Sequence, residues 1–248
     1  MKYVITCILL LIVATGLSQI PTRSSGSVST GSNIDVLDAN RFTISKITTA
    51  PSEINYKEIE GTPYINNNTG ANNYLPIGKF YTPAFEYMET AFARYNAHTD
   101  MMEVSLLDNG VDYYLLKKEP DFLYIVLKDK TYRAYVYNNS MGYFVILSKD
   151  DTQACTLLKK ERVVFKKAEK ASSSFVTSSP DSFKKLRDVY YLKINNSLFE
   201  VPKKKKLFYQ LFRNQAAAVE RYAKNNGLKI NREQDLLEIC RYYNTLTP

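Results

Sequence analysis

The 248-residue chain has no tryptophan, a single histidine and only three cysteines. Because His98 is the one imidazole, catalytic and metal sites that need two histidines are excluded. Three cysteines are too few for a disulfide-dense scaffold. Glycine-rich phosphate loops, Cys-x-x-Cys pairs, Gly-x-Ser-x-Gly elbows and His-Glu-x-x-His helices are also absent from the sequence. The sequence therefore indicates no cofactor, no metal and no catalytic residue.

Tyrosine and phenylalanine are abundant instead, with 20 and 12 residues, and 45% of the chain is hydrophobic against 23% charged. This balance is typical of a globular protein, and aromatic residues favour strands over helices. From Tyr81 to Ile194, short β-prone runs alternate with turn residues at a spacing of about ten, as in antiparallel meanders and sandwiches. The clearest runs are Met88–Tyr95, Met101–Leu107, Val111–Lys118, Phe122–Leu127, Thr131–Tyr137, Tyr143–Ser148, Cys155–Phe165 and Val189–Ile194. Most turns between them are too short for crossover helices, which predicts antiparallel pairing.

The side-chain pattern of these runs predicts how each face is covered. Phe122–Leu127 and Tyr143–Leu147 are apolar at every position, as expected when both faces of a strand are buried. Glu103, Ser105 and Arg133 interrupt their strands at period two, which predicts one solvated face there. A second layer must therefore cover the central strands, in a sandwich, a rolled sheet or a sheet with helices on it.

After Pro202 the pattern becomes helical. Apolar residues recur at helical spacing from Leu207 to Ala223, and Asn225–Gly227 has the composition of a C-terminal cap. Asn231 followed by Gln234 resembles a capping box that opens a last helix. We expect these helices to dock on the sheet and to cover Phe122–Leu127. The predicted fold class is α+β, a mainly antiparallel β-sheet (meander, roll or sandwich) with C-terminal helices packed on it.

The chain divides by composition into four segments. Residues 1–18 have one lysine, an apolar run and small residues ahead of Gln19, the layout of a secretory signal peptide. The apolar run is shorter than the ~20 residues of a spanning helix, so we expect no transmembrane segment in the mature chain, with a retained N-terminal anchor as the alternative. Residues 19–60 form a disordered or peripheral leader, 61–201 an antiparallel β domain, and 202–248 the C-terminal helical segment. Export would leave Cys155 and Cys240 either bridged or as two small buried hydrophobic residues.

The net charge of +8 is concentrated in lysine pairs and in the run Lys203–Lys206. Four lysines in the first turn of a helix oppose its dipole, so local stability does not explain them. They form either a solvated surface or a site for an anionic partner, and Lys203, Lys204, Lys205 and Lys206 are candidate binding residues. The other paired lysines are Lys159, Lys160, Lys166, Lys167, Lys184 and Lys185.

A second candidate binding surface lies on the run Thr131–Tyr137. Alternation places Arg133, Tyr135 and Tyr137 on one side of that strand, and aromatic rings interleaved with a cation are typical of sugar-binding or single-strand nucleic-acid-binding faces. Cross-strand packing of tyrosines gives the same pattern without a ligand. Export argues against nucleic acid as the partner. His98, in the turn Asn96–Asp100, and the pair Asp150–Asp151 are interpreted as turn residues.

Three short motifs stand out: a Gly-x-Pro-Tyr start at Gly61–Tyr64, the hairpin step Arg94–Asn96, and a lysine-rich helical tail that ends near Tyr242–Asn244. They resemble motifs of exported β-rich proteins of Bacteroidetes-type bacteria. The resemblance implies a location in the periplasm or at the cell surface of a Gram-negative bacterium. It implies no activity and no ligand.

Two functional hypotheses follow from these features. The first is a non-enzymatic exported envelope protein that binds an anionic polymer, a glycan or a protein through a basic, tyrosine-rich surface. The second is a hydrolase that acts on an envelope polymer through carboxylates located near the serine-rich segment Ala171–Pro180. Two carboxylates facing each other in a deep cleft would favour the hydrolase, and a shallow surface of lysines and aromatic rings would favour the binding protein.

Overall fold

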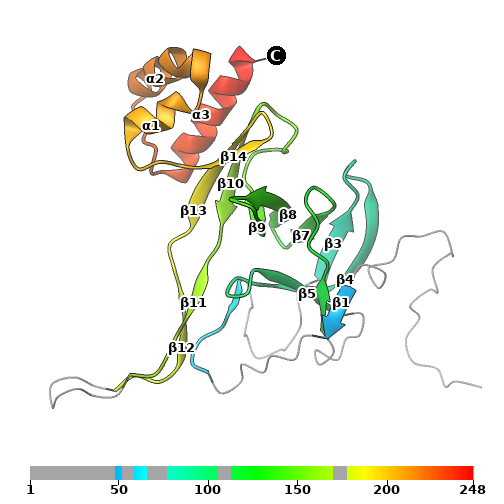
Figure 1. Ribbon diagram of the computed structural model, residues 1–248. Helices are drawn as coiled ribbons and strands as arrows, with labels where there is room; N and C mark the ends of the chain where they lie inside the picture. The colour runs from blue at the N-terminus through cyan, green and yellow to red at the C-terminus, as the bar shows by residue number, and fades with distance from the viewer. Residues whose placement is uncertain (1–47, 52–58, 66–76, 106–112, 170–177, 248) are drawn as a thin grey trace, which may run out of the picture. The chain divides into compact units, whose positions relative to one another are not determined.

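A computed structural model describes residues 48–51, 59–65, 77–105, 113–169 and 178–247, all of which belong to the unit Asn40–Pro248. The expected signal peptide 1–18, residues 19–47 and 52–58 of the expected leader 19–60, and residues 171–177 of the serine-rich segment lie outside the described residues. Of the leader, residues 48–51 form a strand at the edge of the main sheet. Figure 1 shows the strands and the helices that follow them.

The main sheet has 12 strands in the order β1-β6-β5-β4-β3-β7-β8-β9-β10-β13-β14, with β2 beside β4, and β11 and β12 form a separate ribbon. The strands are β1 (Thr48–Pro51), β2 (Tyr64–Ile65), β3 (Ile77–Tyr81), β4 (Tyr87–Asn96), β5 (Met101–Ser105), β6 (Tyr114–Leu116), β7 (Tyr124–Leu127), β8 (Lys130–Tyr137), β9 (Ser140–Ile146), β10 (Cys155–Lys160), β11 (Val163–Lys166), β12 (Ser182–Lys185), β13 (Val189–Ile194) and β14 (Ser197–Glu200). Neighbouring strands pair antiparallel throughout the described residues. The α+β fold class and the antiparallel pairing are therefore confirmed.

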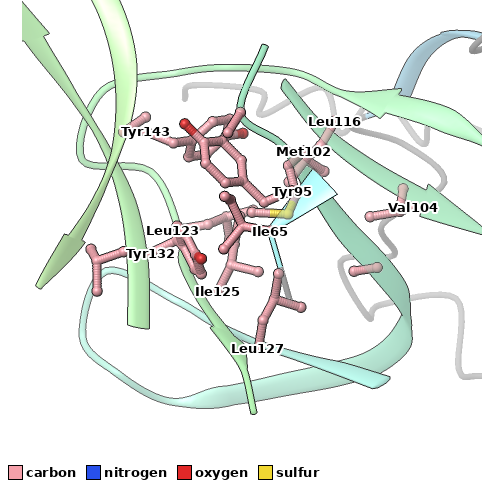
Figure 2. Close-up of a cluster of buried hydrophobic side chains, with 14 of the residues drawn as sticks. Ile65, Tyr95, Met102, Val104, Leu116, Leu123, Ile125, Leu127, Tyr132 and Tyr143 are labelled. Carbon is pink, nitrogen blue, oxygen red and sulfur yellow. The ribbon is translucent and has the colours of Figure 1, made fainter. Parts of the chain in front are cut away.

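The sheet curls so strongly that strands far apart in its order face each other. Strands β4 and β8 are separated by β3 and β7, yet the ring centroids of Tyr95 and Tyr132 lie 5.1 Å apart. Tyr143 on β9 contacts the same Tyr95 ring at 6.2 Å. Together with Met102 and Ile125 these rings form the buried inner core drawn in Figure 2.

The central strands are covered on both faces, as their apolar sequence predicts. In β9, Tyr143 and Val145 point into the inner core, and Phe144 belongs to a second cluster on the opposite face. Leu123, Ile125 and Leu127 pack in the inner core, so the curl of the sheet and not a helix covers this side of the run Phe122–Leu127. The expectation that the C-terminal helices cover this run is wrong.

The helices are α1 (Lys205–Gln210), a 3-10 turn η2 (Arg213–Gln215), α2 (Ala216–Asn225) and α3 (Glu233–Leu246). They pack against one side of β10 and β13, where Cys155, Leu157, Leu192 and Ile194 are at most 4% exposed. The α2 helix ends at Asn225 and Gly227 adopts a positive φ of 65°, as a C-terminal cap requires. These helices therefore share a core with one end of the sheet.

The structure corrects three local expectations. Glu103, Ser105 and Arg133 are not on a solvated face, because they are 1%, 0% and 8% exposed. The run Cys155–Phe165 is not one strand, since β10 ends at Lys160 and Glu161 turns inward before β11. No side chain caps α3, which begins after Arg232, so Asn231 is not the cap of a capping box.

Deleting Pro202–Pro248 should leave the remaining chain insoluble or molten. The deletion uncovers the helix-facing side chains of β10 and β13, and large exposed apolar patches drive association. Size-exclusion chromatography and thermal unfolding of the fragment ending at Val201 test this. A soluble fragment that melts cooperatively would show that the helices are a separate module.

Candidate functional site

Asp151 is the centre of a buried polar cluster on the outer face of the sheet. It lies in the loop between β9 and β10 and is 1% exposed. Tyr124 on β7 donates a hydrogen bond to its Oδ1, and Tyr135 on β8 donates to its Oδ2 at 2.5 Å. Arg133 Nη1 donates to the same Oδ2 at 2.5 Å. Both carboxylate oxygens are therefore occupied by donors from the sheet.

These hydrogen bonds fix the protonation states in the cluster. Burial by itself raises the pKa of Asp151, but the hydrogen bonds from Tyr124, Tyr135 and Arg133 outweigh burial and lower that pKa below its usual 3.8. Burial and the negative charge of Asp151 raise the pKa of the Tyr135 hydroxyl well above its normal range. The cluster thus holds an ionised carboxylate facing protonated tyrosines.

Arg133 joins this carboxylate to the neighbouring loop. Its Nη2 donates to the carbonyl oxygen of Asp121 at 2.7 Å, and its Nη1 also donates to Tyr124 Oη at 2.8 Å. Its guanidinium lies 4.2 Å from the centroid of the Tyr124 ring. Arg133 Nε makes no hydrogen bond, and the Asp121 Oδ1 atom is 3.7 Å away from it. The guanidinium is therefore held rigidly between two loops.

The cluster forms the floor of an open cleft of about 480 Å³. Lys193 on β13 closes one side, where its Nζ donates to the Asp151 carbonyl oxygen at 2.6 Å and lies 3.9 Å from Asp151 Oδ2. The side chains of Asp121, Thr152 and Asn196 line the cleft and are exposed to solvent. The remaining lining residues are Pro83, Pro120, Tyr124, Arg133, Tyr135, Val136, Asp151 and Leu198.

An exposed aromatic ring stands beside the cleft. Phe85, in the loop between β3 and β4, is 53% exposed and has a positive φ of 61°. Its ring stacks on Tyr81 at 4.7 Å and meets the edge of Tyr124 at 5.0 Å. It lines a smaller cavity of about 280 Å³ that shares Pro83, Tyr124 and Thr152 with the cleft. The polar floor and this apolar wall are therefore contiguous.

The structure brings together some of the candidate residues from β8 and not others. Arg133 and Tyr135 are both in the Asp151 cluster. Tyr137 is further along the same face, where its ring meets Tyr191 at 5.0 Å, and it does not line the cleft. The position of Tyr137 is explained by cross-strand packing on Tyr191. The positions of Arg133 and Tyr135 are explained by their hydrogen bonds to the Asp151 carboxylate.

The candidate lysines do not join this cluster. Lys203, Lys204, Lys205 and Lys206 are exposed at the start of α1 and line neither cavity. Lys159 and Lys160 form ion pairs with Glu233 and Asp100 instead. Lys166, Lys167, Lys184 and Lys185 are exposed on or next to the β11–β12 ribbon.

The cleft contains two carboxylates, Asp121 and Asp151, but it is open and they differ in exposure. Asp121 is exposed and accessible to a ligand, with 62% of its side chain in solvent. Asp151 is buried, and its lowered pKa makes it a poor proton donor. Because hydrogen bonds occupy both of its oxygens, Asp151 also has little capacity to act as a base or nucleophile. The geometry favours binding over acid–base chemistry.

Within the described residues, no group of three or more His, Cys, Asp or Glu side chains is arranged to hold a metal ion. No helix in that part of the chain is long and apolar enough to cross a membrane. Comparisons with known protein families, with curated proteins and with solved structures found no match.

Sequence reasoning did not identify Asp151, Tyr124 or Lys193 as site residues. Asp151 has the composition of a turn, and Tyr124 and Lys193 lie in ordinary strand patterns. The only signal was Arg133, a cation in the middle of an aromatic strand. A buried arginine needs an acidic partner, and Asp151 is one of several acidic residues in the sequence that could have been that partner.

Replacing Asp151 by Asn should destabilise the fold by about 3–5 kcal/mol at neutral pH, because Arg133 then loses its buried counterion and keeps only the exposed Asp121, 3.7 Å away. The pKa of Asp151 is lowered on folding, so its contribution is present above about pH 4 and is lost as the pH falls through the folded-state value. Denaturant unfolding from pH 7 to pH 2 should therefore show the gap between parent and variant narrowing in acid. The exposed Asp129→Asn serves as the control, and an equal effect of both changes at neutral pH would contradict the account.

Replacing Lys203–Lys206 together by Glu should abolish retention of the protein on an anionic matrix at low salt. The melting temperature should not fall, because acidic residues suit a helix N-terminus and all four side chains are exposed. The matched control converts Lys166, Lys167, Lys184 and Lys185 to Glu, with the same change in net charge. If the Lys203–Lys206 variant is retained as strongly as the parent, these lysines are solvent-exposed residues at the start of a helix and do not bind an anionic partner.

Proposed function

We propose that this protein is a non-enzymatic binding protein of the bacterial envelope that holds a glycan in the cleft above Asp151. The observation that carries the proposal is the contiguity of two surfaces. A rigid polar floor built on Arg133 and Asp151 adjoins the exposed ring of Phe85. Sugars present hydroxyl groups along their edges and C–H groups on their faces, and this pair of surfaces matches both.

The polar side chains around the cleft suit hydroxyl groups. Asp121 offers acceptors, Asn196 offers donors and acceptors, and the Thr152 hydroxyl, which donates to Asp150 at 2.8 Å, offers an acceptor. All three residues are exposed to a ligand. The floor beneath them is already ordered by its own hydrogen bonds. A ligand that binds there therefore does not have to pay for organising the floor.

The charge of the cleft favours a neutral glycan over a polyanion. Its lining contains two cations, Arg133 and Lys193, and two carboxylates, Asp121 and Asp151. Arg133 already interacts with both acids, and Lys193 with Asp151, so no uncompensated positive charge remains there to recruit an anion. An anionic polymer would instead meet the exposed lysines outside the cleft.

Location in the periplasm or at the cell surface is part of the proposal. It is supported by the composition of residues 1–18 and by the resemblance to exported proteins of Bacteroidetes-type bacteria. Envelope compartments contain the neutral and charged polysaccharides that such a cleft would meet.

Titration with defined oligosaccharides tests the proposal. Because the chain has no tryptophan, its tyrosine emission is an intrinsic probe, and two of its 20 tyrosines, Tyr124 and Tyr135, line the cleft. We expect saturable binding of a neutral hexasaccharide, either maltohexaose or the N-acetylglucosamine hexamer, and weaker binding of hexagalacturonate. Phe85→Ala should weaken that binding about 10-fold, the loss of roughly one aromatic contact.

The matched control is Phe165→Ala, which removes a similarly sized ring, 38% exposed, from the β11–β12 ribbon. It should leave the affinity unchanged. Failure of every hexasaccharide to bind, or equal loss in both variants, would contradict the proposal. Release of new reducing ends from a bound sugar would favour the hydrolase, and Asp121→Asn should then abolish that release.

A further inference from the structure

One cysteine of the β domain, Cys155, and one of the helical segment, Cys240, lie against each other in the core. Cys155 begins β10 and Cys240 lies in the middle of α3, and their Sγ atoms are 3.3 Å apart. The residues are 85 positions apart in the chain and are 0% and 1% exposed. The fold has therefore brought two distant thiols into direct contact.

A neighbouring side chain holds these elements in register. Asn244 lies one turn after Cys240 on α3, and its Oδ1 accepts a hydrogen bond from the Cys155 backbone N–H at 2.7 Å. Its Nδ2 donates to the Cys155 carbonyl oxygen at 2.9 Å. This two-point contact fixes the helix relative to the first residue of the strand. Chance proximity of flexible side chains does not explain the approach of the sulfurs.

The contact lies in a tightly packed apolar region. Cys155 and Cys240 belong to the core cluster shared by β10, β13 and the helices, with Leu157 and Leu236 among its fully buried members. A disulfide bond is about 2.05 Å long, so the sulfurs need to approach by only about 1.3 Å. Both cysteines are free in the structure, and closing this gap would join them.

We propose that Cys155 and Cys240 form a disulfide bond that fastens α3 to β10. The oxidant is a low-molecular-weight or protein disulfide. One thiolate attacks a sulfur of the oxidant, which breaks its S–S bond, forms a mixed disulfide and releases one thiol. The second cysteine thiolate then attacks the mixed disulfide and releases the other thiol, so that the two protons of the cysteines end on the reduced oxidant.

Burial dictates when this bond forms. Because both sulfurs are buried in the folded chain, a bulky oxidant reaches them during folding, and the finished bond is shielded from reductants. The bond does not depend on glycan binding, and export supplies only the oxidising compartment. It closes a long loop containing β11–β14, α1 and α2, which restricts the unfolded chain.

Refolding the full chain in a mixture of oxidised and reduced glutathione tests the proposal. After alkylation in denaturant, peptide mass mapping should find Cys155 and Cys240 in one cross-linked pair that is two hydrogens lighter. Dithiothreitol under denaturing conditions should remove the cross-link. The reduced and refolded protein should melt about 5–15 °C lower than the oxidised protein.

Two variants make the result specific. Cys7→Ala removes the third thiol of the full chain and should leave the cross-link and the melting temperature unchanged. Cys240→Ala should abolish the cross-link and make the melting temperature independent of the redox state. If Cys155 and Cys240 are both alkylated after oxidative refolding of the parent, or if Cys7 supplies the partner, the proposal is overturned.

Discussion

The structure depends on one repeated interaction, a buried or half-buried carboxylate that is held by a tyrosine hydroxyl and a cation. Asp151 has Tyr135 and Arg133 as its partners, each at 2.5 Å. Glu161, 2% exposed, accepts from the Tyr132 hydroxyl at 2.6 Å and pairs with Lys130 at 2.5 Å. Glu103, 1% exposed, is held by Tyr64 and Arg94, and the half-buried Asp100 is held by Tyr95 and Lys160. An isolated buried charge is unstable, so each acid requires its partners to be in place.

This requirement makes the curled sheet specific as well as stable. In each cluster the acid lies on a different strand or loop from the phenol and the cation that hold it, and the cluster forms only in one register. Tyrosine suits this role because its ring fills the core while its hydroxyl reaches the carboxylate. In the Asp151 cluster the same arrangement opens onto solvent, and the ordered donors become the floor of a cleft.

Much of the fold was predictable from local patterns, and the site was only partly so. Alternation and turn chemistry locate most strands and the helices, because these signals act over a few residues. The same rule misplaced Glu103 and Arg133 on a solvated face, since it assigns charged side chains to water. Their burial depends on partners that only the curl of the sheet brings close. The Asp151 cluster draws on β7, β8, β13 and the β9–β10 loop, so no local pattern identifies it.

The most direct test is to observe the Arg133 side chain while a glycan binds. Arginine N–H signals of the ¹⁵N-labelled protein can be followed by NMR during titration with the neutral hexasaccharide that binds most tightly. The account predicts that the Arg133 signals shift saturably with the binding curve. Those of Arg94, which pairs with Glu103 and does not line the cleft, should not move. Unchanged Arg133 signals at saturation would show that the ligand binds elsewhere and would contradict the proposed function of the cleft.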